Sequence, residues 1–265
     1  MDRGVTLYLD LLKKTVTNVI YEDPPNPLTP VRAQDPTPPD PAAFDESRRR
    51  GGEDWPLTAH TMVGLQRLDN LQACVEQVLA DDVPGDLLEA GVWRGGVCVF
   101  MRGLLAAHGV VDRTVWVADS FEGMPVAGED SGGFDHRMRL HRYNDVLGVS
   151  RATVEGNFRR YDLLDEQVRF LPGWFADTLP TAPIDRLAVL RLDGDLYDST
   201  MCTLDALYPK LAIGGYLIID DYGLNTCRQA VEDYRAKHGI DDEIMTIDKF
   251  GAYWRRRHGG PLVGA

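Results

Sequence analysis

Residues 85–103 read GDLLEAGVWRGGVCVFMRG, and this stretch decides the fold class. The apolar run that starts at Leu87 has the length of a buried strand, and it ends at Gly91. Gly95 and Gly96 then precede a second apolar run of helical length. A short strand, a glycine turn and a helix form the first half of a βαβ unit. We therefore expect an α/β domain that begins near residue 85.

The same alternation continues to the end of the chain. Further strands are predicted at 114–120, 167–174, 185–195 and 214–222, and helices at 95–108, 152–164, 199–211 and 226–239. Residues 242–248 and 251–257 close the chain as two strands of a hairpin. Strands that alternate with helices predict a mainly parallel sheet flanked by helices.

Two regions depart from this alternation. Helical spacing of apolar residues predicts helices at 5–20 and at about 61–81, with a proline-rich arm at 24–41 between them. The polar stretch 121–149 is too long for an ordinary connection, so we expect it to form a lid. We predict a helical N-terminal extension at 1–84, a catalytic domain at 85–258 that contains this insert, and a flexible tail at 259–265.

Composition argues against several classes of function. Among the 265 residues, 28 Lys and Arg stand against 41 Asp and Glu, a formal net charge of −13. Nucleic-acid footprints are usually basic, so we expect no nucleic-acid partner. We also expect no membrane span, because no run of about 18 apolar residues occurs. The chain start lacks the apolar core of a secretory signal. Four cysteines without disulfide or zinc spacing favour reduced thiols in the cytoplasm: Cys74, Cys98, Cys202 and Cys227.

The glycine loop after the first core strand is a candidate ligand site. Glu89 lies at the strand end, the glycines allow close backbone approach, and the helix start offers unpaired N–H groups. Thirty residues later Asp119 ends the second strand, where a carboxylate can accept hydrogen bonds from ribose hydroxyls. The glycine spacing does not match the dinucleotide fingerprint. The alternative interpretation is a tight turn with a solvated aspartate.

A cluster of aspartates lies at the ends of the predicted strands 185–195 and 214–222. Asp193 and Asp195 end the strand near 185–195, while Asp220 and Asp221 end the strand near 214–222. If these strands are neighbours, four carboxylates converge at one sheet edge, which is unfavourable unless a cation binds. We predict a Mg²⁺ or Ca²⁺ site formed by Asp193, Asp220 and Asp221. Asp195 is left open as a ligand or a base, and Asp198 is expected to cap the following helix. The alternative is that all these carboxylates face solvent.

Seven stretches of the chain, in order, resemble the macrocin O-methyltransferase family. They are LYLDLLKKTVTNVIYED (7–23), TAHTMVGLQRLDNL (58–71), GDLLEAGVWRGGVCVFMRG (85–103), RTVWVADSFEGMP (113–125), VRFLPGWFADTLP (168–180), RLAVLRLDGDLYDST (186–200) and LIIDDY (217–222). Members of this family use S-adenosylmethionine to methylate sugar hydroxyls of bacterial antibiotics such as macrolides and aminocoumarins. The proline-rich arm matches no family motif, and the insert matches only in LHRYN (140–144).

The resemblance implies a Rossmann-like class I methyltransferase fold with a seven-stranded sheet, a lid and dependence on Mg²⁺. It implies that Asp193, Asp220 and Asp221 hold the metal and that Asp193 and Asp195 are catalytic, with Asp195 as general base. It assigns the S-adenosylmethionine site to Thr61, Met62, Glu89, Ala90, Gly91, Val92, Trp93, Asp119, Ser120, Gly173, Trp174, Phe175 and Asp177, with Asp177 at the adenine.

The expected substrate is a glycosylated small molecule with a deoxysugar. A metal-dependent methyltransferase of a catechol-like acceptor is the alternative, and a non-catalytic cofactor-binding protein is a third hypothesis. We also expect a homo-oligomer, since a helical extension and an exposed arm suit subunit contacts.

Overall fold

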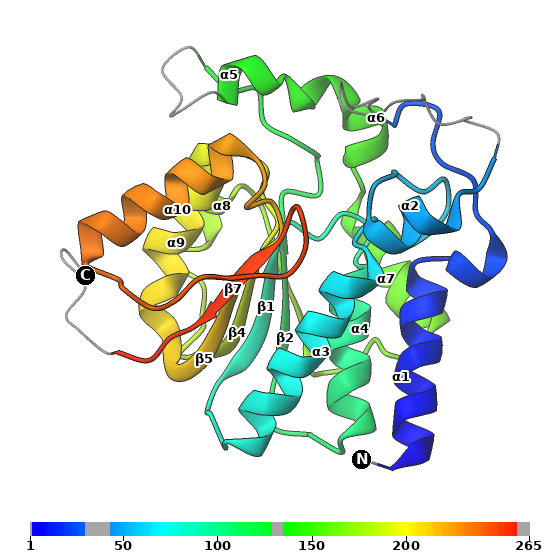
Figure 1. The fold of residues 1–265 in the computed structure, drawn as a ribbon, viewed down its shortest axis with the longest axis horizontal. Coiled ribbons are helices and arrows are strands. Elements are labelled where there is room, and N and C mark those ends of the chain that lie inside the picture. The colour runs from blue at the N-terminus through cyan, green and yellow to red at the C-terminus, as the bar shows by residue number, and fades with distance from the viewer. Residues whose placement is uncertain (1, 30–42, 129–134, 259–265) are drawn as a thin grey trace.

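A seven-stranded sheet forms the centre of the computed structural model, which describes residues 2–29, 43–128 and 135–258 (Figure 1). The strand order is β3-β2-β1-β4-β5-β7-β6. The parallel strands are β3 (Val168–Pro172), β2 (Val115–Asp119), β1 (Asp86–Ala90), β4 (Leu187–Leu192) and β5 (Leu211–Ile219). The antiparallel edge consists of β7 (Ala252–Arg255) and β6 (Met245–Thr246). The mainly parallel sheet and its closing hairpin are confirmed.

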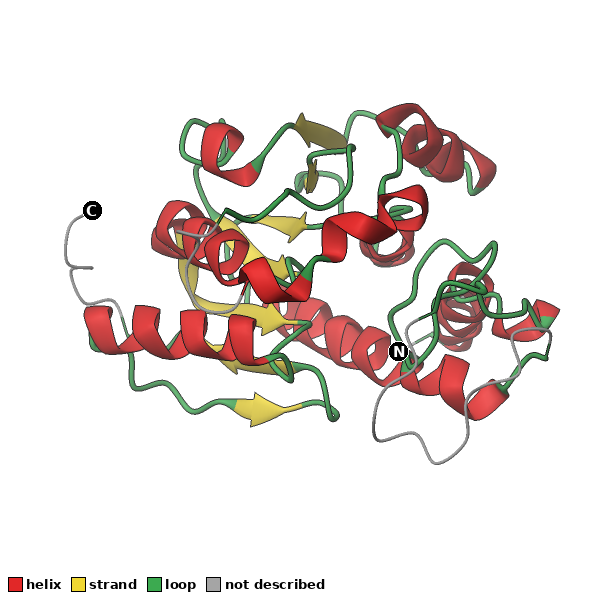
Figure 2. Cartoon of the chain, turned by 90° about the horizontal axis from the view of Figure 1, so that it is seen from above, coloured by secondary structure: helices red, strands yellow, loops and turns green. Residues whose placement is uncertain are grey.

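Helices cover both faces of the sheet (Figures 1 and 2). One face packs against α3 (Leu65–Ala80), α4 (Gly96–Ala107) and α7 (Arg151–Arg160), and α1 (Arg3–Val16) lies against α4. The other face packs against α8 (Phe175–Thr178), α9 (Tyr197–Leu207) and α10 (Asn225–His238). The short helices of the insert and α2 (Glu46–Gly51) lie at the carboxyl edge of the parallel strands (Figure 1).

Strand alternation divides the core into two layers. Leu87 and Val189 belong to the core under α3 and α4, whereas their neighbours Leu88 and Leu190 belong to the core under α9 and α10. Successive side chains of a strand point to opposite faces, so a strand that is buried on both faces reads as a continuous apolar run. Glu89 follows the same alternation and therefore lies on the face covered by α3 and α4.

Two helix boundaries predicted in the N-terminal extension are wrong. The helix expected at 61–81 begins only at Leu65, because Thr61 folds back and its Oγ1 accepts a hydrogen bond from the Val63 N–H at 3.0 Å. The helix expected at 5–20 ends at Val16. Asn18 then adopts a left-handed backbone conformation, φ 51°, and a short 3₁₀ turn, η1 (Val19–Tyr21), follows. A left-handed residue cannot continue a right-handed helix.

The N-terminal extension is joined to the sheet through a shared core. Leu9, Leu12 and Leu68 pack in the same apolar cluster as Leu87 of β1. Buried Arg49 of α2 pairs with Asp54 and donates to backbone carbonyls, which fixes the loops on either side of that helix. Residues 30–41 of the predicted proline-rich arm and the predicted tail at 259–265 lie outside the described residues.

The insert contains three short helical segments. They are α5 (Asp135–Met138), η2 (Leu140–Tyr143) and α6 (Asn144–Leu147). Asn144 anchors the insert, because its side-chain amide both accepts from the Met124 N–H and donates to the Met124 carbonyl. A further 3₁₀ turn, η3 (Tyr208–Lys210), links α9 to β5.

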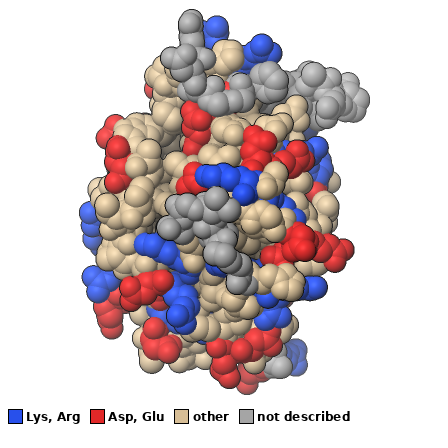
Figure 3. Space-filling model, turned by 90° about the vertical axis from the view of Figure 1, so that its left-hand side faces the viewer, with Lys and Arg blue, Asp and Glu red and all other residues tan. Residues whose placement is uncertain are grey.

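The surface reflects the acidic composition. Figure 3 shows acidic side chains in several groups over one face, with basic side chains between them. Within the described ranges, no helix is both long and apolar enough to cross a membrane. All four cysteines are free, and three of them are buried.

Gly91 provides a test of the fold at the turn after β1. Its φ is 89°, and an added Cβ would lie 1.7 Å from the Asp193 carbonyl oxygen. Gly109 has a similar φ of 66° with nothing within 4 Å of that position, so it is a matched control. We expect Gly91→Ala to lower the free energy of unfolding by about 3 kcal/mol or more, and Gly109→Ala by about 1–2 kcal/mol. Equal losses in urea denaturation would contradict the close approach at Gly91.

Candidate active site

The candidate site lies where the sheet order reverses. β1 has β2 on one side and β4 on the other, so the connections that leave these strands diverge and open a crevice at their carboxyl ends. Two cavities of 540 and 110 Å³ occupy this crevice. Both are lined by Gly91, Asp119 and Asp193, so they are adjoining parts of one site.

Asp119 shapes the loops that border both cavities. One carboxylate oxygen accepts from the Val92 N–H at 2.8 Å, and the other accepts from the Phe121 N–H at 2.7 Å. Burial raises the pKa of Asp119, while these backbone hydrogen bonds oppose that rise. The carboxylate thus joins the loop after β1 to the loop after β2. A carboxylate at this strand end can also accept from a ribose hydroxyl.

The structure brings together most of the residues that the family resemblance assigns to the cofactor. The larger cavity is lined by Gly91, Asp119, Ser120, Trp174 and Phe175. The smaller cavity is lined by Thr61, Met62, Glu89, Gly91, Val92, Trp93 and Asp119. Ala90 is buried in β1, and neither Gly173 nor Asp177 is among the described lining residues. Asp177 is exposed on α8, next to Ala176, which does line the larger cavity.

The N-terminal segment reaches the smaller cavity through the start of α4. The Gly96 N–H donates to the His60 carbonyl at 2.8 Å, and the Arg94 guanidinium donates to the Ala59 carbonyl at 2.9 Å. These contacts hold Thr61 and Met62 against the glycine loop. Thr61 and Met62 therefore reach the site from an extended segment before α3, which corrects their predicted place in the helix.

The insert meets the N-terminal segment above the smaller cavity. Trp55 and Tyr143 make an edge-to-face contact with ring centroids 5.4 Å apart. The Trp93 indole N–H donates to the Val146 carbonyl at 2.8 Å, which ties the glycine loop to α6. The segment around Trp55 and the insert together form a roof over the loops at the strand ends.

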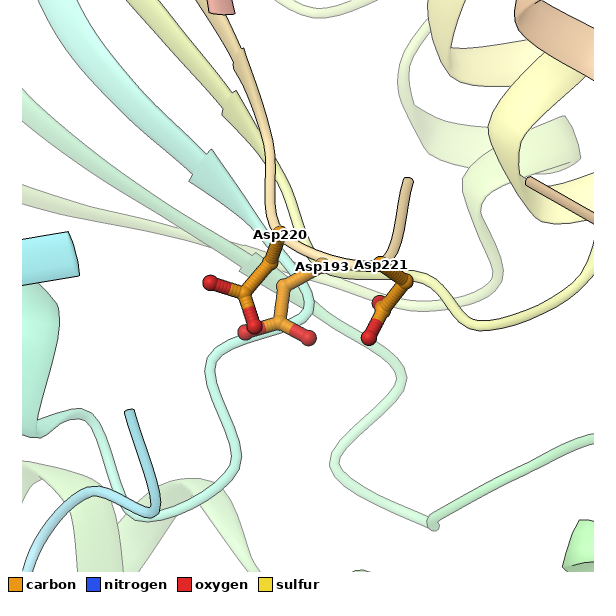
Figure 4. Close-up of side chains that lie close together, drawn as sticks. All are labelled: Asp193, Asp220 and Asp221. Carbon is orange, nitrogen blue, oxygen red and sulfur yellow. The ribbon is translucent and has the colours of Figure 1, made fainter. Parts of the chain in front are cut away.

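The predicted convergence of aspartates is present. β4 pairs with β5, and Leu192 lies beside Ile219 at the ends of the two strands. One carboxylate oxygen from each of Asp193, Asp220 and Asp221 lies within 4.8 Å of the others, and Figure 4 shows the three side chains directed into the same space. Three oxygen ligands at this spacing suit a hard divalent cation.

Two buried arginines compensate part of this charge, and the sequence analysis missed both. Arg191 of β4 donates to Glu89, Asp193 and Asp220, and Arg67 of α3 donates to the other oxygen of Asp220. Arg191 could have been noticed as the single charged residue inside the apolar run LAVLRL (187–192). Arg67 sits in an amphipathic helix, and its spacing carries no comparable signal.

The residues present fit a divalent cation. Arg67 and Arg191 pair with Glu89, Asp193, Asp220 and Asp248, whereas no ion pair within the described ranges involves Asp195 or Asp221, so the site holds more carboxylates than cations. Burial raises the pKa of Asp221, and the charges of Asp195 and Asp193 raise it further. A quarter of the Asp193 side-chain surface remains exposed, so the cluster is accessible.

Asp195 has the environment of a general base. Burial raises its pKa to about 7, and the charges of Asp193 and Asp220 add to that rise. Its backbone has φ 55°, an uncommon conformation for a residue with a side chain. Two contacts hold this conformation: its N–H donates to Asp221 at 3.2 Å, and its carbonyl accepts from Thr226 at 2.6 Å. Asp195 lines the smaller cavity together with Asp193.

The predicted helix cap at Asp198 is wrong. Asp198 lies inside the first turn of α9, and Leu196 occupies the cap position without a side-chain hydrogen bond. The cap comes instead from Asp135 of the insert, whose carboxylate accepts from the N–H groups of Tyr197 at 2.7 Å and Asp198 at 3.0 Å. Asp135 also lines the larger cavity, so this contact joins the insert to the cavity wall.

The sheet order, the glycine loop after β1 and the paired cavities define a class I methyltransferase with a Rossmann-like fold, as predicted. A family model described as Macrocin-O-methyltransferase (TylF) matches residues 5–256. The chain belongs to this family and is an O-methyltransferase that uses S-adenosylmethionine. The family resemblance stated from the sequence is confirmed.

Individual relatives are similar over nearly their whole length. The chain is 58% identical to demethyldecarbamoylnovobiocin O-methyltransferase of Streptomyces niveus, covering 95% of this chain and 94% of the relative. It is 57% identical to mycinamicin III 3''-O-methyltransferase of Micromonospora griseorubida, covering 96% and 97% respectively. The solved structure of the O-methyltransferase NovP superposes with a TM-score of 0.89 at 56% identity, covering 96% of this chain and 100% of that one.

Urea denaturation can test whether Asp135 or Asp198 caps α9. Asp135→Ala removes the acceptor for two N–H groups of α9, so we expect the free energy of unfolding to fall by about 1–2 kcal/mol. Asp198→Ala leaves both N–H groups capped by Asp135, so we expect a smaller loss of about 0.5 kcal/mol. The reverse order would show that Asp198 is the cap after all.

Proposed function

We propose that this chain transfers a methyl group from S-adenosylmethionine to a sugar hydroxyl of a glycosylated natural product, with Mg²⁺ at Asp193, Asp220 and Asp221. The observation that carries the proposal is the aspartate cluster beside the cofactor cavities. The names of the relatives support the sugar acceptor: one acts on mycinamicin III at a 3'' position, and another on a rhamnosyl tetracenomycin at a 4' position.

The two cavities correspond to the two halves of the cofactor. The larger one has aromatic walls at Trp174 and Phe175 and suits the adenosine, with Asp119 available for the ribose. The smaller one contains Thr61 and buried Glu89 and suits the polar methionine end. Asp193 borders both cavities, so the sulfonium carbon would lie close to the aspartate cluster.

The residues of the cluster have two roles in activating the hydroxyl: three aspartates would hold the cation, and a fourth accepts the proton. A bound Mg²⁺ would supply Lewis-acid polarisation of the sugar oxygen. Asp195 lies beside the three proposed ligands and takes the hydroxyl proton at a carboxylate oxygen as the new C–O bond forms. The methyl C–S bond of S-adenosylmethionine breaks in the same step, and S-adenosylhomocysteine is the leaving group. The methyl donor is already activated, so the remaining contribution of the protein is alignment of the two reactants.

The roof of the site keeps water from the reacting atoms. Trp55 comes from the N-terminal segment and Tyr143 from the insert, and their contact closes the space above the smaller cavity. Substrate must therefore pass between two segments that are separate in the sequence. Opening and closing of such segments commonly accompanies binding and release.

An assay of methyl transfer with and without a chelator tests this proposal. The purified protein would be incubated with S-adenosylmethionine and a desmethyl deoxysugar glycoside, before and after treatment with EDTA. We expect chelation to lower turnover at least about a hundredfold, because the cation activates the hydroxyl, and added Mg²⁺ to restore it. Unchanged turnover after complete metal removal would contradict the metal role.

The same assay separates the competing functions. Turnover on catechols but not on glycosides would replace the sugar acceptor by a phenolic one. Calorimetry that detects no binding of S-adenosylhomocysteine would contradict the cofactor assignment itself. Binding that survives EDTA would show that the treated protein is still folded and that lost turnover reports on the metal.

Asp195→Asn tests the general base. The amide keeps the size of the side chain but cannot take a proton, so we expect turnover to fall by about 10²- to 10⁴-fold. Binding of S-adenosylhomocysteine should stay within about twofold, because the role proposed for Asp195 concerns the acceptor hydroxyl and not the cofactor. A variant that loses affinity while turnover at saturation is normal would remove Asp195 from the base role.

A further inference from the structure

We infer that Arg191 is a positioning residue that joins the cofactor subsite to the metal subsite. This inference rests on the proposed function, which assigns Glu89 to the cofactor and Asp193 and Asp220 to the metal. Arg191 lies beneath both cavities and is absent from the described lining of either. Its guanidinium nevertheless donates to all three of these carboxylates.

The sheet dictates this arrangement. Arg191 of β4 lies in register with Glu89 of β1 and Ile218 of β5. Asp193 and Asp220 each stand two residues beyond a member of that row, so the alternation of strands directs them to the same face. One guanidinium nitrogen, Nη1, donates to Glu89 and also to Asp193 at 2.9 Å, while Nη2 donates to Asp220.

Burial makes these contacts strong determinants of orientation. Arg191 and Glu89 are each 1% exposed and Asp220 is 4% exposed, so water does not screen the ion pairs. The planar fork of an arginine fixes the direction of each carboxylate, whereas a lysine ammonium offers one point charge. Replacing Arg191 by Lys therefore keeps the charge and removes the shared geometry.

Arg67 provides a contrast within the same network. It pairs with the second oxygen of Asp220 and lies 3.2 Å from Asp248, and among the described residues it forms no ion pair with Glu89. Its position links the metal subsite to the β6–β7 hairpin. Arg191 orients Glu89 as well as the metal ligands, whereas Arg67 pairs, among these carboxylates, only with the metal ligand Asp220. Replacement of Arg67 should therefore affect the metal subsite alone.

Two binding measurements on the same set of proteins test the inference without recourse to turnover. Calorimetry gives the Kd of S-adenosylhomocysteine, and electron paramagnetic resonance gives the Kd of Mn²⁺. We expect Arg191→Lys to weaken both by about tenfold, in the range for residues that orient metal ligands. Arg67→Lys should weaken only Mn²⁺ binding. Arg102→Lys is the matched control, since Arg102 forms a two-nitrogen pair with Asp165 away from the site.

Double variants separate positioning from general loosening of the fold. If Arg191 acts through Glu89, adding Arg191→Lys to Glu89→Gln costs no further S-adenosylhomocysteine affinity. If it acts through Asp193, adding it to Asp193→Asn costs no further Mn²⁺ affinity. Additive losses in both cycles would overturn the inference, as would an effect of Arg191→Lys on one ligand only.

Two other results would contradict the proposed function itself and not the role of Arg191. Failure of Glu89→Gln to weaken cofactor binding, or of Asp193→Asn to weaken Mn²⁺ binding, would contradict the site assignments themselves. If Arg191→Lys does not fold, Arg67→Lys still decides the point. Selective loss of Mn²⁺ binding in that variant supports the separation of contacts, and equal loss of both ligands overturns it.

Discussion

The site depends on one electrostatic constraint, the collection of like charges at the carboxyl ends of β1, β4 and β5. Five carboxylates reach this edge, and desolvation makes each of them unfavourable unless it is paired. Arg191 is held by three of them from below, and Arg67 holds one from the side of α3. Among the described residues neither arginine forms an ion pair with Asp195 or Asp221, so this part of the cluster has no basic partner. Glu89, Asp193 and Asp195 line the smaller cavity, where the sulfonium cofactor and a divalent cation would bring positive charge.

The regions outside the sheet complete this site. Residues 55–62 come from the N-terminal segment and supply part of the wall and the roof of the smaller cavity. The insert supplies the remainder. Asn144 joins the two arms of the insert at Met124, and Asp135 connects the insert to the start of α9. An edge of a parallel sheet is open to solvent by construction, so enclosure must come from such added segments. In this chain they are held by hydrogen bonds to the same loops that carry the cofactor residues.

Local patterns in the sequence predicted most of the fold. Short apolar runs bounded by glycine and aspartate gave the strands of the sheet, and the rule that parallel strand ends share an edge predicted the meeting of Asp193 with Asp220 and Asp221. The rule failed where a partner is distant in the chain. The cap of α9 comes from Asp135, about sixty residues before the helix, so no local pattern could identify it. The buried roles of Arg67 and Arg191 likewise depend on which strands and helices become neighbours. Asp177 was assigned by resemblance alone, and its exposed position leaves the adenine contact a prediction.

The most direct test of the account is a crystal structure with S-adenosylhomocysteine and Mn²⁺, in which anomalous scattering locates the metal. The account predicts one ion bound by oxygens of Asp193, Asp220 and Asp221 at about 2.0–2.3 Å. It also predicts that the cofactor sulfur faces that ion, with Asp195 beside both. An ion bound elsewhere, or an aspartate cluster that stays free of metal at saturating Mn²⁺, would contradict the central claim.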